Sequence, residues 1–88
     1  MNWSIIKTNR FQKRYKVLPT SIQEKFKQVV LKFLQDPFNQ SLRTHKLKWK
    51  LEWLYSSSIN DEYRFVTIID MEKHEITFVN IWTHEIYK

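Results

Sequence analysis

The spacing of the apolar residues changes partway along this 88-residue chain, and that change limits the fold class. Residues 22–33 carry apolar side chains at the i, i+4, i+7, i+8 and i+11 positions of one helix face: Ile22, Phe26, Val29, Val30 and Phe33. From residue 51 onward the apolar side chains recur at every second position, which is typical of strands with one buried face. A helical first half followed by a strand-forming second half predicts an α+β fold.

The first half of the chain is expected to form one strand and two helices. Residues 3–7 are rich in strand formers, and the Thr8-Asn9 pair offers a cap for the helix that follows. The second helix is expected to begin with a capping box, because Thr20–Gln23 and Ser21–Glu24 both have its spacing. It should end at Asp36-Pro37, since the residue before a proline is disfavoured in the helical conformation.

The second half is expected to form an antiparallel meander after a polar, basic connection over residues 38–48. Asn60-Asp61 supplies the first turn, because both residues tolerate positive φ in a chain without glycine. The expected strands cover residues 51–56, 63–69 and 76–82. The predicted order is therefore β-α-α-β-β-β, with two N-terminal helices packed on a small antiparallel sheet in a single domain over residues 1–88.

The composition excludes several kinds of site. The chain has no cysteine, so disulfides and thiolate metal ligands are ruled out, and no glycine, so glycine-rich phosphate loops are ruled out. His45, His74 and His84 have no metal-ligand spacing, so neither a metal nor another cofactor is expected. No apolar run is long enough to span a membrane, and the N-terminus does not resemble a signal peptide, so we expect a cytoplasmic protein without a membrane partner.

The positive charge is concentrated in the first part of the chain. Residues 1–50 carry 12 basic and 2 acidic side chains, whereas residues 51–88 carry 3 basic and 7 acidic ones, for a net charge of +6. Such a basic segment suggests an anionic partner, most simply a nucleic acid. The alternative is that these charges only keep two exposed helices solvated.

Three groups of residues could carry chemistry. Residues 44–50 combine His45 with lysines and a tryptophan, as expected for RNA contact or for a solvated loop. Arg64 lies in a hydrophobic strand, where its planar guanidinium could bind a phosphate or pair with Asp61, Glu62 or an acidic residue of a neighbouring strand. His84 and Tyr87 follow the last strand and could transfer protons and stack, or could be ordinary surface residues.

Three short motifs, in this order and on this succession of elements, resemble a known family. They are His45-Lys46-Leu47-Lys48, the run from Ile59 to Arg64, and the run from Ile81 to Tyr87. Over essentially the whole chain, the sequence resembles the RelE/ParE superfamily of toxins from bacterial toxin–antitoxin pairs. RelE-like members are small basic ribonucleases that cut mRNA in the ribosomal A site without a metal, through attack of the messenger's own 2′-hydroxyl on the adjacent phosphate.

The resemblance implies a role for each candidate residue. His45 and His84 match the catalytic histidines of the YafQ-like branch and would be general base and acid, in an order that the sequence leaves open. Arg64 would stabilise the phosphate, and Tyr87 would orient or stack. The residues expected to bind RNA are Arg43, Lys46, Lys48, Lys50 and Trp53.

This chain also departs from the family pattern. Trp49 and Trp82 stand where glycine is usual, Ser58 stands near a catalytic-type residue of many relatives, and the lysine pair of RelE has no clean match. The alternatives are therefore a ParE-like inhibitor of DNA gyrase that is not an enzyme, and a degenerate toxin that only binds its antitoxin. The expected partners are a cognate antitoxin, the ribosome and mRNA, with operator DNA contacted only through the antitoxin complex.

Overall fold

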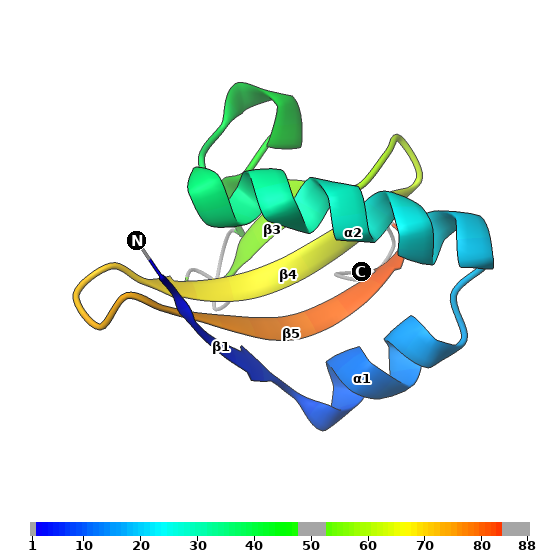
Figure 1. The fold of residues 1–88 in the computed structure, drawn as a ribbon, viewed down its shortest axis with the longest axis horizontal. Helices are drawn as coiled ribbons and strands as arrows, with labels where there is room; N and C mark the ends of the chain where they lie inside the picture. The colour runs from blue at the N-terminus through cyan, green and yellow to red at the C-terminus, as the bar shows by residue number, and fades with distance from the viewer. Residues whose placement is uncertain (1, 48–52, 84–88) are drawn as a thin grey trace.

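The computed structural model describes residues 2–47 and 53–83 (Figure 1). Its helices and strands in chain order are β1 (Ser4–Lys7), α1 (Asn9–Lys16), α2 (Thr20–Gln35), a 3₁₀ turn η1 (Gln40–Leu42), β2 (His45–Lys46), β3 (Tyr55–Ser58), β4 (Tyr63–Asp70) and β5 (Glu75–Thr83). The predicted α+β fold is confirmed, and β2 is an additional short strand within the segment expected to be a connection.

The strands form one five-stranded sheet in the order β1-β5-β4-β3-β2. Strands β2 to β5 pair antiparallel, as the predicted meander requires. At one edge of this mostly antiparallel sheet, β1 runs parallel to β5 from Ser4↔Glu75 to Lys7↔Phe78, a pairing that the sequence did not predict. The two helices separate β1 from the rest of the sheet in sequence, and a crossover of this length permits a parallel neighbour.

The added strand β2 depends on a backbone conformation that residue types did not reveal. Arg43 has a φ of 54°, in the left-handed region, and this turns the chain from η1 into β2. The expected positive φ at Asn60-Asp61 is not observed, because among residues 2–47 and 53–83 only Arg43 and His74 have it. A strand of two residues is too short to show an alternating pattern.

Of the two predicted helix N-caps, the one for α1 is correct and the one for α2 is wrong. Thr8 caps α1 as expected: its Oγ1 accepts from the Phe11 amide at 3.1 Å. The capping box predicted for α2 is wrong, because Pro19 is the N-cap and no side chain caps this end. Gln23 instead donates from Nε2 to the Tyr15 carbonyl at 2.8 Å, which ties the start of α2 to the end of α1.

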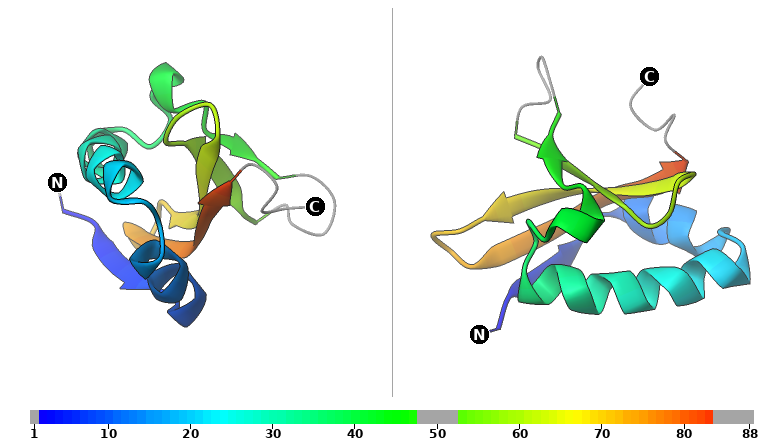
Figure 2. Two further views of the ribbon diagram at one scale, coloured as in Figure 1. Left: turned by 90° about the vertical axis from the view of Figure 1, so that its right-hand side faces the viewer. Right: turned by 90° about the horizontal axis from the view of Figure 1, so that it is seen from above.

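The predicted apolar stripe of α2 forms the centre of the core. Phe26 and Phe33 are buried, and each meets Phe65 of β4 edge-on, with ring centroids 5.3 and 5.1 Å apart. Figure 2 shows α2 lying along one face of the sheet. No helix in the described parts of the chain is long and apolar enough to cross a membrane.

Strand β3 begins later than expected. Trp53 lies in a turn with 76% of its surface exposed, and the strand covers Tyr55–Ser58. Ser56 and Ser57 are almost completely buried within it. The Ser57 hydroxyl lies 2.7 Å from the Thr44 hydroxyl, so this buried polar group has a partner. Because the buried residues of this strand are serines, the sequence shows no alternation of apolar and polar residues here.

Candidate active site

The strand register brings two of the predicted catalytic residues to one face of the sheet. His45 pairs with Ser56, Ser56 pairs with Val66, and Ser58 pairs with Arg64. Directly paired residues project from the same face, and so do residues two apart on one strand. His45 and Arg64 therefore project from one face, whereas Phe65 projects from the other and contacts α2.

The two side chains can approach a common ligand from this face. They lie two strands apart and two residues apart along the strand direction. A strand spacing of about 4.8 Å and a rise of about 3.4 Å per residue place their Cα atoms roughly 12 Å apart. Both side chains are long enough to reach toward a single phosphodiester between them.

His45 is held in one tautomer by a backbone contact. Its Nδ1 lies 2.9 Å from the carbonyl oxygen of Arg43, and the side chain is exposed at the start of β2. Because a carbonyl oxygen only accepts, Nδ1 must donate its hydrogen to it. The neutral ring then carries no proton on Nε2, which is the form that a general base requires.

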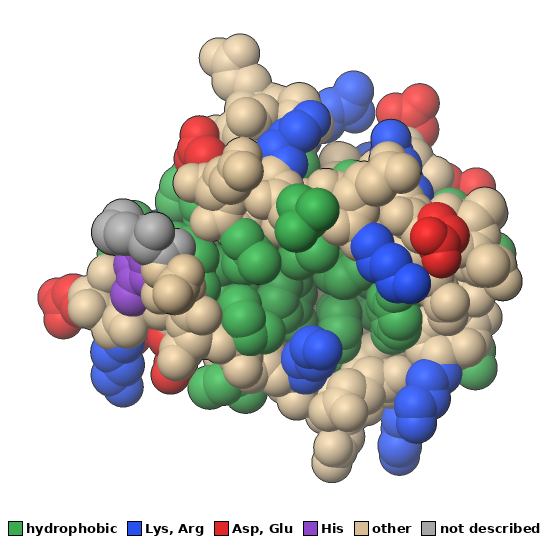
Figure 3. Space-filling model, viewed as in Figure 1, with side chains coloured by type: hydrophobic (Ala, Val, Ile, Leu, Met, Phe, Trp, Pro, Cys, Tyr) green, Lys and Arg blue, Asp and Glu red, His purple; other side chains and the backbone are tan. Residues whose placement is uncertain are grey.

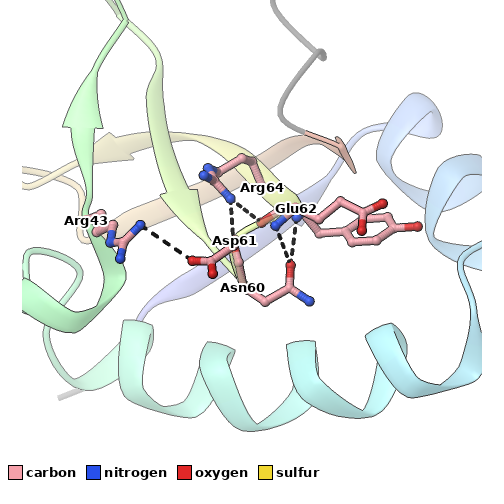
Figure 4. Close-up of polar contacts among 6 residues, drawn as sticks. Arg43, Asn60, Asp61, Glu62 and Arg64 are labelled. Atoms are coloured by element: carbon pink, nitrogen blue, oxygen red, sulfur yellow. Dashed lines mark hydrogen bonds and ion pairs between the residues drawn. The ribbon is translucent and has the colours of Figure 1, made fainter.

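Arg64 is held by carbonyl groups instead of carboxylates. Its Nη1 donates to the Asn60 carbonyl and, at 3.0 Å, to the Tyr63 carbonyl (Figure 4). The ion pair with Asp61 or Glu62 that the sequence left open does not form, and Asp61 instead lies 3.8 Å from Arg43. Within residues 2–47 and 53–83 no acidic side chain pairs with Arg64, so its charge is available to an anion there.

Asn60 organises the turn that supports Arg64. Its Oδ1 accepts from the amides of Glu62, at 2.9 Å, and Tyr63, at 2.8 Å, while its own carbonyl accepts from Arg64 (Figure 4). Asn60 thus fixes both the start of β4 and one anchor of the guanidinium. In the sequence, the Asn60-Asp61 pair indicates only a turn and gives no sign of the contact with Arg64.

Several solved toxin structures share this arrangement of strands and helices. YafQ from E. coli matches with a TM-score of 0.81 and 12% identity, over 99% of this chain and 100% of that one. A YoeB/ParE toxin from Agrobacterium tumefaciens matches with a TM-score of 0.79 and 18% identity, over 92% and 98%. This chain has the RelE/ParE toxin fold. No family model and no curated protein matches its sequence.

The same fold occurs in toxins solved together with a second protein. The YoeB–YefM complex from Staphylococcus aureus matches with a TM-score of 0.76 and 20% identity, over 96% of this chain and 99% of that one. The RelE-like fold predicted from the sequence motifs is therefore confirmed by structures that share few residues with this chain.

Of the remaining predicted residues, only Arg43 lies beside His45; the others lie elsewhere on the RelE/ParE fold or outside the described residues. Arg43 lies next to the His45 site, where its backbone holds the imidazole and its side chain faces Asp61. Lys46 pairs with Tyr55 and so projects from the opposite face to His45. With Trp53 it lines a separate groove of about 370 Å³ near the end of β4. The other predicted residues, Lys48, Lys50, His84 and Tyr87, lie outside the described residues.

His74, at the end of the turn before β5, has a structural role. Its ring stacks on Trp3 with centroids 3.8 Å apart, and its Nδ1 lies 2.8 Å from the Asn2 carbonyl. It therefore joins the β4–β5 turn to the N-terminal strand. Within residues 2–47 and 53–83, no group of three or more histidine and acidic side chains is arranged to hold a metal ion.

Proposed function

We propose that this protein is the toxin of a type II toxin–antitoxin pair and that it cleaves mRNA on the ribosome in the cytoplasm. One observation carries the proposal: His45, whose Nδ1 is held by a backbone carbonyl, and Arg64, which forms no ion pair among the described residues, project from the same face of the sheet. A base and a cation on one face meet two requirements of phosphodiester cleavage by an internal hydroxyl. The RelE/ParE fold supports the same conclusion.

In the proposed reaction the RNA supplies its own nucleophile. His45 Nε2 takes the proton from a ribose 2′-hydroxyl, and the oxygen attacks the adjacent phosphorus. Negative charge accumulates on the non-bridging oxygens, toward which Arg64 donates hydrogen bonds. The bond to the 5′-oxygen breaks, and that oxygen receives a proton from a general acid, which we assign to His84. The products are a 2′,3′-cyclic phosphate and a 5′-hydroxyl.

The geometry of Arg64 suits the phosphate. A guanidinium has five N–H donors in a planar fork, and both carbonyl contacts are made by Nη1. Nε and Nη2 have no partner among the residues that the structure describes, so they can donate together to two phosphate oxygens, which is the bidentate arrangement that arginine favours. The carbonyl contacts restrict the rotamer, so less conformational entropy is lost when the phosphate binds.

We assign RNA binding to the basic and aromatic residues predicted from the sequence. Arg43 adjoins the site, and Lys46 with the exposed Trp53 would contact nucleotides beyond the sheet edge. Lys48 and Lys50 would hold the backbone, and Tyr87 would orient or stack on a base. This protein needs no metal in the proposed reaction, because the hydroxyl is activated by a side chain.

Induced expression in bacteria tests this function directly. We expect growth arrest with cleaved messenger RNA, and both effects should be lost in His45→Asn and Arg64→Ala. His74→Asn is the matched control, because asparagine tolerates the left-handed backbone of His74 and this histidine lies away from the site. DNA damage with intact messages would instead identify a gyrase inhibitor, and normal growth would identify a degenerate toxin.

We also propose that the protein binds a cognate antitoxin. Several solved structures with this fold are complexes, among them RelE–RelB from Pyrococcus horikoshii and YoeB–YefM from Staphylococcus aureus. Any contact with operator DNA would then be made through the complex. Co-expression with the antitoxin should restore growth, and a toxin still active in its presence would contradict this assignment.

A further inference from the structure

Trp82 lies next to Arg64 on the sheet face that also carries His45. It is the direct register partner of Arg64 on the neighbouring strand β5, so both side chains project from that face, with Cβ atoms about 5 Å apart. The other face of the sheet packs against α2, and hydrophobic side chains gather at its centre (Figure 3). Trp82 is half-buried and adjoins the candidate active site.

Arg14 reaches the Trp82 ring from the edge of the sheet, where α1 lies beside β5. The pairing of β1 with β5 ends at Phe78. The Thr8 amide donates to the Phe78 carbonyl at 3.0 Å, its hydroxyl donates to the Val79 carbonyl at 2.7 Å, and α1 begins at the next residue. The guanidinium carbon of Arg14 lies 4.9 Å from the centroid of the Trp82 ring.

The guanidinium of Arg14 has no hydrogen-bond or ion-pair partner among residues 2–47 and 53–83. A guanidinium that lies over a ring keeps N–H donors at its edge for hydrogen bonds, so Arg14 can contact the ring and an anion together. The ring of Trp82 therefore has an arginine on either side, Arg64 on β4 and Arg14 on α1. This arrangement suits a ligand with a flat, uncharged part between two negative charges, as in a nucleotide of single-stranded RNA.

We propose that Trp82 and Arg14 form a subsite for the nucleotide on the 3′ side of the bond that is cut. The inference rests on the proposed function, which assigns the scissile phosphate to Arg64. In that reaction His45 takes the proton of the upstream 2′-hydroxyl, and the leaving 5′-oxygen lies opposite the attacking oxygen. Trp82 lies on the side of Arg64 away from His45, which is the side of the leaving group. The downstream base stacks on Trp82, and the next phosphate accepts from Arg14.

The position of Trp82 in the sequence agrees with this assignment. His84, to which we assign proton donation to the leaving oxygen, follows Trp82 by two residues. Trp82 also stands where glycine is usual in the family that the sequence resembles, so its ring is particular to this chain. The ring should therefore change substrate affinity and the choice of downstream base. Purines should be preferred there, because they have the larger surface for stacking.

Cleavage by the full chain on purified ribosomes programmed with mRNA tests the subsite. After the cut has been mapped, a second message carries an abasic nucleotide directly 3′ of it. In the wild type the abasic nucleotide should raise KM about 10-fold with little change in kcat, which is the effect of one lost stacked base. In Trp82→Leu, KM should already be about 10-fold higher on the intact message and should rise no further on the abasic one. An abasic effect of equal size in both proteins would overturn the subsite.

A binding measurement separates the subsite from a structural role of the ring, which also packs against the core. The probe is a fluorescein-labelled RNA of six nucleotides whose 2′-O-methyl groups prevent cleavage, and it is followed by fluorescence anisotropy. Trp82→Leu should bind about 10-fold more weakly than the wild type, whereas Trp82→Phe, which keeps a ring, should bind within about 3-fold. Arg14→Leu should bind about 3- to 10-fold more weakly. Arg10→Leu removes the same charge one helical turn earlier, at an exposed site, and should bind like the wild type.

A wild type that binds this RNA no better than Trp82→Leu would overturn the subsite, and so would equal losses in Arg14→Leu and Arg10→Leu. If the protein cleaves mRNA but fails these comparisons, the subsite is contradicted and the proposed function stands. If it binds the probe through Trp82 and Arg14 but cleaves no mRNA, the nuclease function is contradicted and the two residues are supported as an RNA-binding surface.

Discussion

Replacing Asn60 with alanine should weaken the β3–β4 turn and loosen Arg64. The substitution removes the Oδ1 acceptor of two amide hydrogens, those of Glu62 and Tyr63, at 2.9 and 2.8 Å. Each intramolecular hydrogen bond contributes about 0.5–1.5 kcal/mol, and water can partly replace the lost acceptor at this exposed turn. We therefore expect a loss of about 1–2 kcal/mol in the free energy of unfolding.

Thermal unfolding followed by circular dichroism measures this loss. For a domain of this size 1 kcal/mol shifts Tm by about 4–8 °C, so Asn60→Ala should lower Tm by about 5–15 °C. Asn60→Asp keeps the acceptor and should remain near the wild type. Asp61→Ala is the neighbouring control, because its ion pair with Arg43 is almost fully solvated and contributes little.

The activity of Asn60→Ala separates a positioning role from a merely structural one. Because Arg64 also bonds to the Asn60 carbonyl, a relaxed turn should lower mRNA cleavage even at temperatures where the variant is fully folded. Asn60→Asp should restore both stability and cleavage. An unchanged Tm in Asn60→Ala, or an Asn60→Asp variant as unstable as the alanine one, would refute this account of the turn.

Three further predictions concern other parts of the molecule. His45→Asn should lower the rate of RNA cleavage about 10²- to 10⁴-fold without changing Tm, as measured on purified ribosomes programmed with mRNA. Phe33→Ala should cost about 3–5 kcal/mol in urea unfolding, because this ring is completely buried against Phe65. Trp3→Phe should cost about 1–2 kcal/mol, since it removes the 2.9 Å bond from Nε1 to the Leu34 carbonyl.

The elements predicted best are those with a long pattern of their own. Helix α2 shows nearly three turns of apolar spacing, and β4 and β5 are rich in β-branched and aromatic residues, so their positions followed from local preference. The end of α2 was equally clear, because Pro37 prevents the preceding residue from continuing the helix.

The elements predicted poorly depend on neighbours. Strand β2 has two residues and exists because β3 pairs with it, and Ser56 and Ser57 are buried because strands lie on both sides of them. The predicted capping box at the start of α2 does not form, because Pro19 is the N-cap and Gln23 donates to the Tyr15 carbonyl at the end of α1. A local sequence pattern does not show which distant residues will pack or pair with a segment.

Local preference and periodicity were thus enough to determine the α+β class and the two helices, because both depend on residues close in the chain. The lack of glycine and cysteine was enough to exclude glycine-rich phosphate loops, disulfides and thiolate metal sites. Only the tertiary structure paired β1 parallel with β5, placed Arg14 over Trp82, and brought His45 and Arg64 to one face while turning Lys46 to the other. Register decides these placements, because a shift of one residue moves a side chain to the opposite face of a sheet.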